Sequence, residues 1–164
     1  MNRLGMRGII IVLPTILICL SFINPFCFGE LKLEVRNQEF FTVYDFKRIP
    51  EYFTGREYTG GKVYCRSKPK SRDGFYFVVK VGGAKQELPI RSQWILDWVT
   101  SADPVSKTQK VPITDLNLFG KEVFVGLTGE HWPDRSLKPL AWRLRLCDGQ
   151  GSTLASNQSF LWSK

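Results

Sequence analysis

Residues 142–162 read WRLRLCDGQGSTLASNQSFLW, and this stretch holds the plainest strand pattern of the chain. From residue 142 to residue 147, large apolar side chains alternate with arginine or cysteine, which is the period of a half-buried β-strand. The turn sequence DGQG occupies residues 148–151, and Phe160 and Trp162 lie on one face of the run that follows. We therefore predict an antiparallel hairpin that closes the chain.

The same two-residue period recurs upstream, in residues 75–81 (FYFVVKV), 94–99 (WILDWV) and 123–127 (VFVGL). These runs are short and rich in β-branched and aromatic residues, and sequences with Gly, Pro and Asp separate them. An edge strand is expected near residues 40–46, and no helical period of useful length is visible after residue 29. Seven or eight strands at this spacing predict an all-β fold, an antiparallel two-sheet sandwich.

At the level of architecture, residues 142–162 resemble the closing hairpin of immunoglobulin-like or fibronectin-like domains. The resemblance covers about 20 residues. It implies an immunoglobulin/fibronectin-like sandwich, and a fold analogy of this kind implies no function.

The N-terminal segment has the parts of a secretory signal peptide. Arg3 and Arg7 precede an apolar run over residues 9–23, and small residues stand at the −3 and −1 positions of a cleavage site after Gly29. The alternative is an uncleaved membrane anchor, because residues 8–28 are long enough to span a bilayer. Both interpretations place residues 30–164, a length typical of one domain, on the extracytoplasmic side, secreted or periplasmic.

The chain has four cysteines, of which Cys19 and Cys27 lie in the leader, and neither follows the small residue that lipid attachment requires. Cys65 and Cys147 remain, and two thiols in an oxidising compartment predict one disulfide. Strand parity places Cys65 inward and Cys147 outward, so the bridge requires Cys147 to lie at a strand end. The alternative is two buried thiols.

Positive charge gathers in one segment. The chain has 23 Lys and Arg against 15 Asp and Glu, and the leader contains two of the arginines and no acid. The local cluster consists of Lys62, Arg66, Lys68, Lys70 and Arg72. Pro69 keeps this segment extended, so that its charges could project like a comb toward an anionic envelope polymer or an unknown protein partner. The alternative is a solvated hairpin tip, and Arg143 and Arg145 could extend the patch.

Aromatic residues in loops form the other candidate site. Trp132 lies in a turn beside Pro133, where an exposed ring could stack on a sugar. Tyr52, Phe53 and Tyr58 flank a turn and could form a second aromatic surface, unless they cover the open end of the sandwich.

Catalytic patterns are not found. His131 is the single histidine, and the chain has no Gly-x-Ser-x-Gly elbow and no phosphate-binding loop. Asp97 alternates with Trp94 and Trp98 and is expected to face solvent. One histidine and two cysteines do not make a structural zinc site, so we expect no metal. Because the catalytic patterns are not found either, we expect no cofactor and no enzyme activity.

These observations predict an exported, non-enzymatic binding or adaptor module, with an anionic ligand as the favoured class. Nucleic acid is not expected, because the domain is exported and has no base-stacking motif. A membrane contact is expected only through the leader, if the leader is retained. The alternatives are a small carbohydrate-binding domain that uses Trp132, and a structural envelope subunit that adds a strand to a neighbour.

Overall fold

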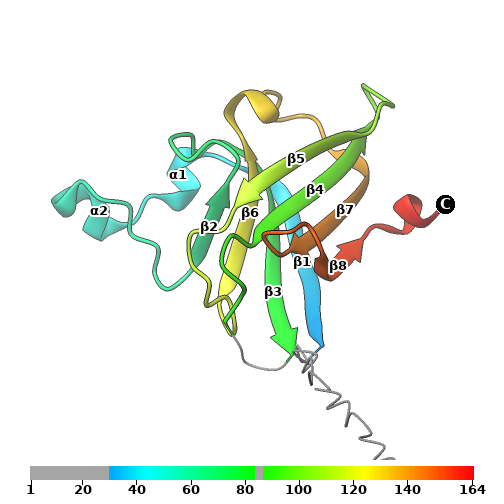
Figure 1. Ribbon diagram of the computed structural model, residues 1–164. Helices are drawn as coiled ribbons and strands as arrows, with labels where there is room; N and C mark the ends of the chain where they lie inside the picture. Colours follow the sequence, from blue (N-terminus) through cyan, green and yellow to red (C-terminus); the bar gives the residue numbers. More distant parts are fainter. Residues whose placement is uncertain (1–29, 84–86) are drawn as a thin grey trace, which may run out of the picture.

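A computed structural model describes residues 30–83 and 87–164, and these residues are mostly β-structure (Figure 1). One sheet contains β1 (Leu31–Phe41), β3 (Gly74–Gly83), β6 (Glu122–Thr128) and β2 (Val63–Arg66), in that order; the other contains β5 (Lys107–Pro112), β4 (Gln93–Thr100), β7 (Pro139–Cys147) and β8 (Thr153–Gln158), in that order. The predicted all-β sandwich of two sheets is therefore confirmed. The strand pairing is antiparallel apart from the short β2, which pairs with β6 in parallel.

The main core lies between the two sheets and follows from the two-residue alternation. Phe75, Phe77 and Val79 point inward from β3, and the inward side chains of β4 and β7 meet them. The rings of Phe77 and Trp142 pack edge to face across the interface, with centroids 5.1 Å apart. Among the described residues, the buried members of this core come from residues 31–155, so a large core forms within residues 30–164.

The outer face of the first sheet carries a second apolar cluster. Tyr76, Val78 and Phe124 point away from the main core, yet they are buried together with Phe46. Phe46 lies 5.0 Å from the ring of Tyr76, centroid to centroid, and covers it. This explains why residues 75–81 are apolar on both faces of the strand.

Phe46 belongs to the first of two short helices, α1 (Val43–Phe46) and α2 (Ile49–Thr54). The predicted edge strand over residues 40–46 is therefore wrong beyond Phe41, where β1 ends. The carboxylate of Asp45 accepts hydrogen bonds from the backbone N–H and the hydroxyl of Thr42 (2.7 and 2.8 Å), and this cap begins α1.

The C-terminal hairpin of β7 and β8 is confirmed, but Phe160 and Trp162 lie beyond it in a 3₁₀ turn, η2 (Phe160–Ser163). Ser159 ends the ladder, because its backbone N–H donates to the carbonyl of Trp142 and its hydroxyl accepts from the Trp142 N–H. Trp162 is therefore outside the core, and the guanidinium of Arg143 lies 5.2 Å from its ring centroid.

The signal-peptide and anchor predictions concern residues 1–29 and lie outside the described residues. Within residues 30–83 and 87–164, no helix is both long enough and apolar enough to cross a bilayer.

Candidate functional site

Arg66, in the middle of the predicted basic comb, is buried instead of projecting into solvent. Its guanidinium forms a bidentate ion pair with Glu57, with Nη1 donating to Oε2 at 2.7 Å, and its Nε donates to the hydroxyl of Tyr76 at 3.0 Å. The rings of Phe46 and Tyr64 lie 5.3 and 5.0 Å from the same guanidinium. Arg66 therefore joins the segment after α2 to the outer face of the first sheet.

The protonation of this cluster follows from its contacts. The hydrogen bond from Arg66 lowers the pKa of Glu57, although partial burial opposes the shift. Burial lowers the pKa of Arg66, but the hydrogen bonds to Glu57 and Tyr76 raise it on balance. Burial raises the pKa of Tyr76 to about 12. The ion pair is therefore fully charged at neutral pH, beside a neutral phenol.

Arg72 provides a second attachment of the same segment. Its Nη1 lies 2.6 Å from Oε1 of Glu51 in α2, and its Nε lies 3.7 Å from Oε1 of Glu57. The expectation that Arg66 and Arg72 project freely is therefore wrong, because carboxylates from residues 51 and 57 fold back onto them. Sequence reasoning did not foresee this pairing.

The three lysines of the predicted comb stay nearer to solvent. Lys62 pairs with Glu122 at 2.8 Å and Lys68 with Glu130 at 2.5 Å, and each of these pairs is well exposed. Exposed pairs of this kind contribute little to stability. Among the described residues, Lys70 makes no ion pair within 4 Å and is exposed. The cluster therefore presents less net positive charge than its sequence indicates.

Arg143 and Arg145 do not extend the basic segment. Both contact the same carboxylate oxygen of Asp97, at 3.1 and 3.0 Å, on the outer face of the second sheet. Thr108 donates its hydroxyl to the other oxygen at 2.7 Å. The expectation that Asp97 faces solvent is therefore wrong, since it is buried beneath the arginines it pairs with.

Trp132 is not an exposed loop side chain. It follows the 3₁₀ turn η1 (Gly129–His131) and is 3% exposed. Its ring lies 4.8 Å from the ring of Phe75 and 6.1 Å from that of Trp98, centroid to centroid. The expectation that Trp132 is exposed for stacking on a sugar is therefore wrong, because the turn packs the indole against the main core; binding of a sugar by the protein stays a prediction.

Cys65 and Cys147 are separate buried thiols, and the predicted disulfide is not formed. Cys65 points into the main core from β2, whereas Cys147 lies in the opposite sheet beside the hydroxyl of Thr153, at 3.8 Å. The two cysteines thus lie in different sheets, and of the two only Cys65 belongs to the main core between them. Burial raises the pKa of Cys65 to about 11, so its thiol is unreactive at neutral pH.

His131 lies in η1, with its Nε2 3.9 Å from Glu130. In the part of the chain that the structure describes, no three His, Cys, Asp or Glu side chains gather closely enough to hold a metal ion. The expected absence of enzyme activity stays a prediction.

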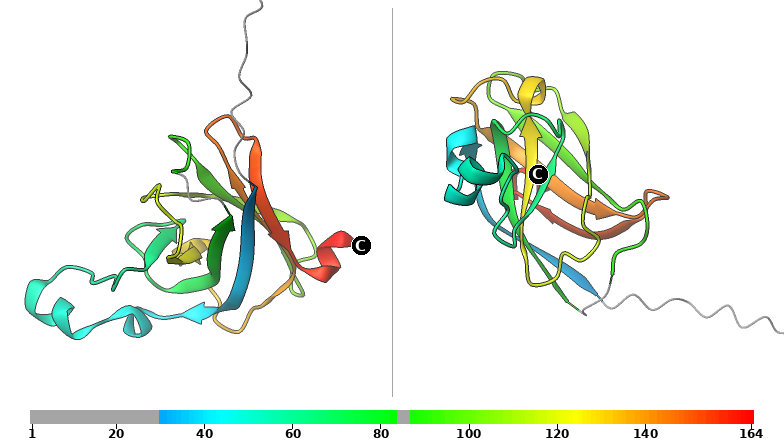
Figure 2. Two further views of the ribbon diagram at one scale, coloured as in Figure 1. Left: turned by 90° about the horizontal axis from the view of Figure 1, so that it is seen from below. Right: turned by 90° about the vertical axis from the view of Figure 1, so that its left-hand side faces the viewer.

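Five of the ten large apolar side chains that are exposed in the described residues lie on residues 43–58, which we name the aromatic arm. Tyr44, Ile49, Tyr52 and Phe53 are between 72% and 85% exposed, and Tyr58 is about half exposed. Figures 1 and 2 show α1 and α2 protruding beyond the first sheet, away from the rest of the sandwich. The alternative in which these residues cover the open end of the sandwich is therefore wrong.

The arm is ordered by contacts on its inner side. Helices of four and six residues are too short to be stable alone. Phe46 anchors α1 in the outer cluster, and Glu51 and Glu57 anchor the following segment through Arg72 and Arg66. The exposed rings are thus presented from a fixed support.

The outward charges of the arm are mainly positive. Arg48 and Arg56 are exposed, and the ammonium of Lys47 lies 5.8 and 5.3 Å from the ring centroids of Tyr44 and Tyr52. The two glutamates of the arm turn inward to their arginines. Asp45 is the exposed acid, and its carboxylate is engaged by Thr42.

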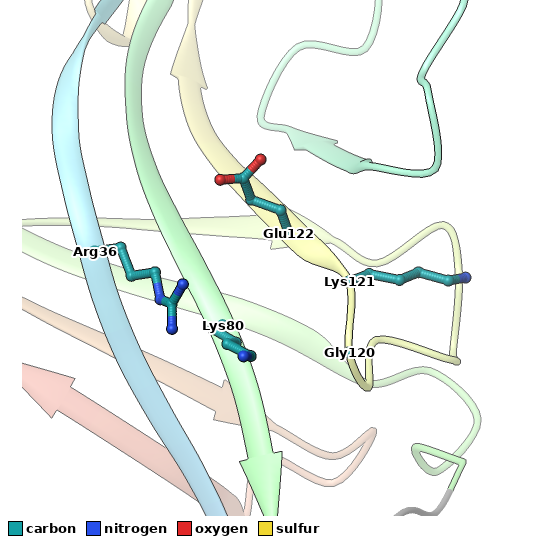
Figure 3. A pocket seen from close by; sticks show the side chains of 5 residues that line it. All are labelled: Arg36, Lys80, Gly120, Lys121 and Glu122. Carbon is teal, nitrogen blue, oxygen red and sulfur yellow. The ribbon is translucent and has the colours of Figure 1, made fainter.

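A separate shallow hollow of about 150 Å³ lies on the outer face of the first sheet, lined by Arg36, Lys80, Gly120, Lys121 and Glu122 (Figure 3). The head groups of Arg36 and Lys80 lie near each other, while Lys121 extends away from them. Arg36 contacts Glu34 at 3.4 Å, Lys121 contacts Asp115 at 2.6 Å, and Glu122 contacts Lys62. The hollow could hold a small anion, but neighbouring residues already neutralise most of its charge.

No protein-family model, curated protein or solved structure matches this chain. The functional argument therefore depends on the residues themselves.

Proposed function

We propose that residues 30–164 form a non-enzymatic, extracytoplasmic binding module whose contact surface is the aromatic arm. One observation carries the proposal: Tyr44, Ile49, Tyr52 and Phe53 are at least 72% exposed within ten residues of sequence. Exposed apolar residues that gather in one place mark interaction sites, whereas single ones are ordinary. The extracytoplasmic location rests on the leader sequence.

The energetics favour this surface. Complete burial of one large apolar side chain contributes roughly 1.5–3 kcal/mol, so a partner that covers these four has several kcal/mol to gain before the costs of association. The ion pairs of Arg66 and Arg72 hold the arm in place beforehand, which reduces the conformational entropy lost on binding.

Among the described residues, the other large exposed apolar side chains are Ile90, Val105 and Leu140, with Phe160 and Leu161 next to each other in η2. Phe160 belongs to η2, on the side of the molecule opposite the arm (Figure 1). It supplies a matched control, because it is 74% exposed and Phe53 is 85% exposed.

The test is site-specific photo-crosslinking of the exported protein. A benzophenone amino acid replaces Phe53 in one variant and Phe160 in the other, and intact cells are irradiated before the products are separated by mass. We expect adducts from position 53 and far fewer from position 160. Equal yields at the two positions, or no adduct at position 53, would refute the arm as the contact surface.

For the fold, we propose an immunoglobulin/fibronectin-like relationship of architecture alone. The β7–β8 hairpin beside β4 supports it, and the parallel pairing of β2 with β6 is a departure from it. This relationship carries no functional argument.

A further inference from the structure

The composition of the arm is that of a side-chain set suited to a membrane interface. Three of its exposed side chains are the tyrosines Tyr44, Tyr52 and Tyr58, which have an apolar ring and a polar tip. Side chains of this kind prefer the boundary between water and hydrocarbon. Ile49 and Phe53 add purely apolar surface, and Phe53 is the most exposed of the five.

The charges of the arm complement an anionic surface. Lys47, Arg48 and Arg56 lie among or beside the exposed rings, and the ammonium of Lys47 lies near two of them. Glu51 and Glu57 do not oppose these cations, because each is paired with an arginine outside the arm, and Asp45 leaves one exposed carboxylate against the three cations. Basic residues close to anionic lipid headgroups are attracted to them, and basic residues beside apolar rings are typical of interfacial segments.

The shape of the arm fits the same partner. Figure 2 shows the two helices protruding from the sandwich. The small hollow on the arm is lined by Lys47, Glu51, Tyr52 and Gly55, so it places an ammonium and a carboxylate beside an aromatic ring. A protruding apolar tip fits a partner that deforms around it, as a bilayer surface does.

We propose that the aromatic arm binds the surface of an anionic lipid bilayer, with its rings at the headgroup boundary and its three cations on lipid phosphates. This proposal rests on the proposed function, since it names the partner of the same surface. It also differs from the expectation that any membrane contact is made through the leader, because it places a contact in residues 43–58.

The test measures vesicle binding by the chain from Glu30 to Lys164, which contains both core clusters that the described residues form. The probes are sedimentable vesicles of phosphatidylcholine alone and of phosphatidylcholine with an equal amount of phosphatidylglycerol. We expect binding to the anionic vesicles that is at least about tenfold tighter than to the neutral ones and that weakens with salt.

Two variants and their matched controls localise the contact. Phe53→Ser is expected to weaken binding about tenfold, and Phe160→Ser is expected to leave it unchanged. Arg56→Gln is expected to weaken binding to anionic vesicles about fivefold, with Lys70→Gln as the exposed control. Unchanged urea midpoints confirm that the variants are folded, which is expected because all four side chains are exposed.

The outcomes separate this proposal from the one on which it rests. If the chain binds neither kind of vesicle while position 53 crosslinks to a protein, the lipid proposal is overturned and the proposal of a binding module is retained. If Phe53→Ser and Phe160→Ser bind anionic vesicles equally well, the lipid proposal is overturned as well. Equal crosslinking at positions 53 and 160 refutes the proposed function itself.

Discussion

Replacing Arg66 with methionine tests whether the basic segment holds the aromatic arm in place. The side chain of Arg66 is 7% exposed and that of its partner Glu57 is 23% exposed. Methionine has a similar length and keeps apolar contact with the rings of Phe46 and Tyr64, so the loss falls mainly on the polar contacts. These are the bidentate ion pair and the hydrogen bond to Tyr76.

Removing one partner of a buried ion pair costs about 3–5 kcal/mol of stability, because the other charge is left without compensation. Glu57 keeps some contact with water, which places the expected loss for Arg66→Met at the lower end, about 3 kcal/mol. For a domain of this size, that loss lowers the melting temperature by roughly 10 °C.

The assay is urea unfolding followed by tryptophan fluorescence. Four tryptophans are buried, at positions 94, 98, 132 and 142, so their emission shifts when the sandwich unfolds. With a slope near 2 kcal/mol per molar urea, the midpoint should fall by about 1.5 M. Lys70→Met, in the same segment but exposed, should change the stability by less than about 0.5 kcal/mol.

A double-mutant cycle with Glu57→Gln isolates the pair itself. Residues in direct contact show coupling energies of about 0.5–3 kcal/mol, and we expect about 2 kcal/mol for Arg66 with Glu57. The reasoning is refuted if Arg66→Met costs less than about 1 kcal/mol, or if the two substitutions are additive. In either case the arm is not held by this ion pair.

Three further predictions follow from the same structure. The pKa of Glu57 is lowered from 4.5 in the folded protein, so the contribution of this carboxylate to folding stability is present above its unfolded pKa and is lost as pH falls through its folded pKa. The urea midpoint should therefore fall less steeply below pH 5 in Glu57→Gln than in the parent. Alkylation without reductant should modify both Cys65 and Cys147 in urea, and Cys65 should resist alkylation at pH 8 in the folded state. A protein that takes up no label in urea and has a mass two hydrogens below that of the reduced chain would show a disulfide and contradict the free thiols. Gly126→Ala should destabilise the domain by about 1–3 kcal/mol in urea unfolding, because a Cβ at this position overlaps the ring of Tyr76; an unchanged midpoint would show that the ring moves freely.

The helices of the arm show where sequence analysis could have gone further. Thr42 with Asp45 is a capping pair, Pro50 lies in the first turn of α2, and Gly55 ends it with a φ of 65°. These are start and stop signals of helices. A helical period cannot show in four or six residues, and Tyr44 and Phe46 also fit a strand pattern.

The basic segment shows what sequence analysis could not supply. Neither residues 66–72 nor their neighbours in sequence reveal that Glu51 and Glu57 fold back onto two of the arginines. Trp132 is a similar case, since a tryptophan beside a turn and a proline can be either exposed or packed, and the local sequence does not distinguish the two arrangements.

The residue pattern alone is enough to predict the all-β fold, the two sheets, the closing hairpin and the inward faces of the strands that contain residues 75–81, 94–99, 123–127 and 142–147. It is enough because a two-residue alternation of side chains is a local property that selects one buried face. Which charges are paired and which aromatic side chains stay exposed could be learned only from the folded chain. Those outcomes depend on groups that lie far apart in sequence and meet only when the chain is folded, and here they neutralise Arg66 and Arg72 while leaving the aromatic arm uncovered.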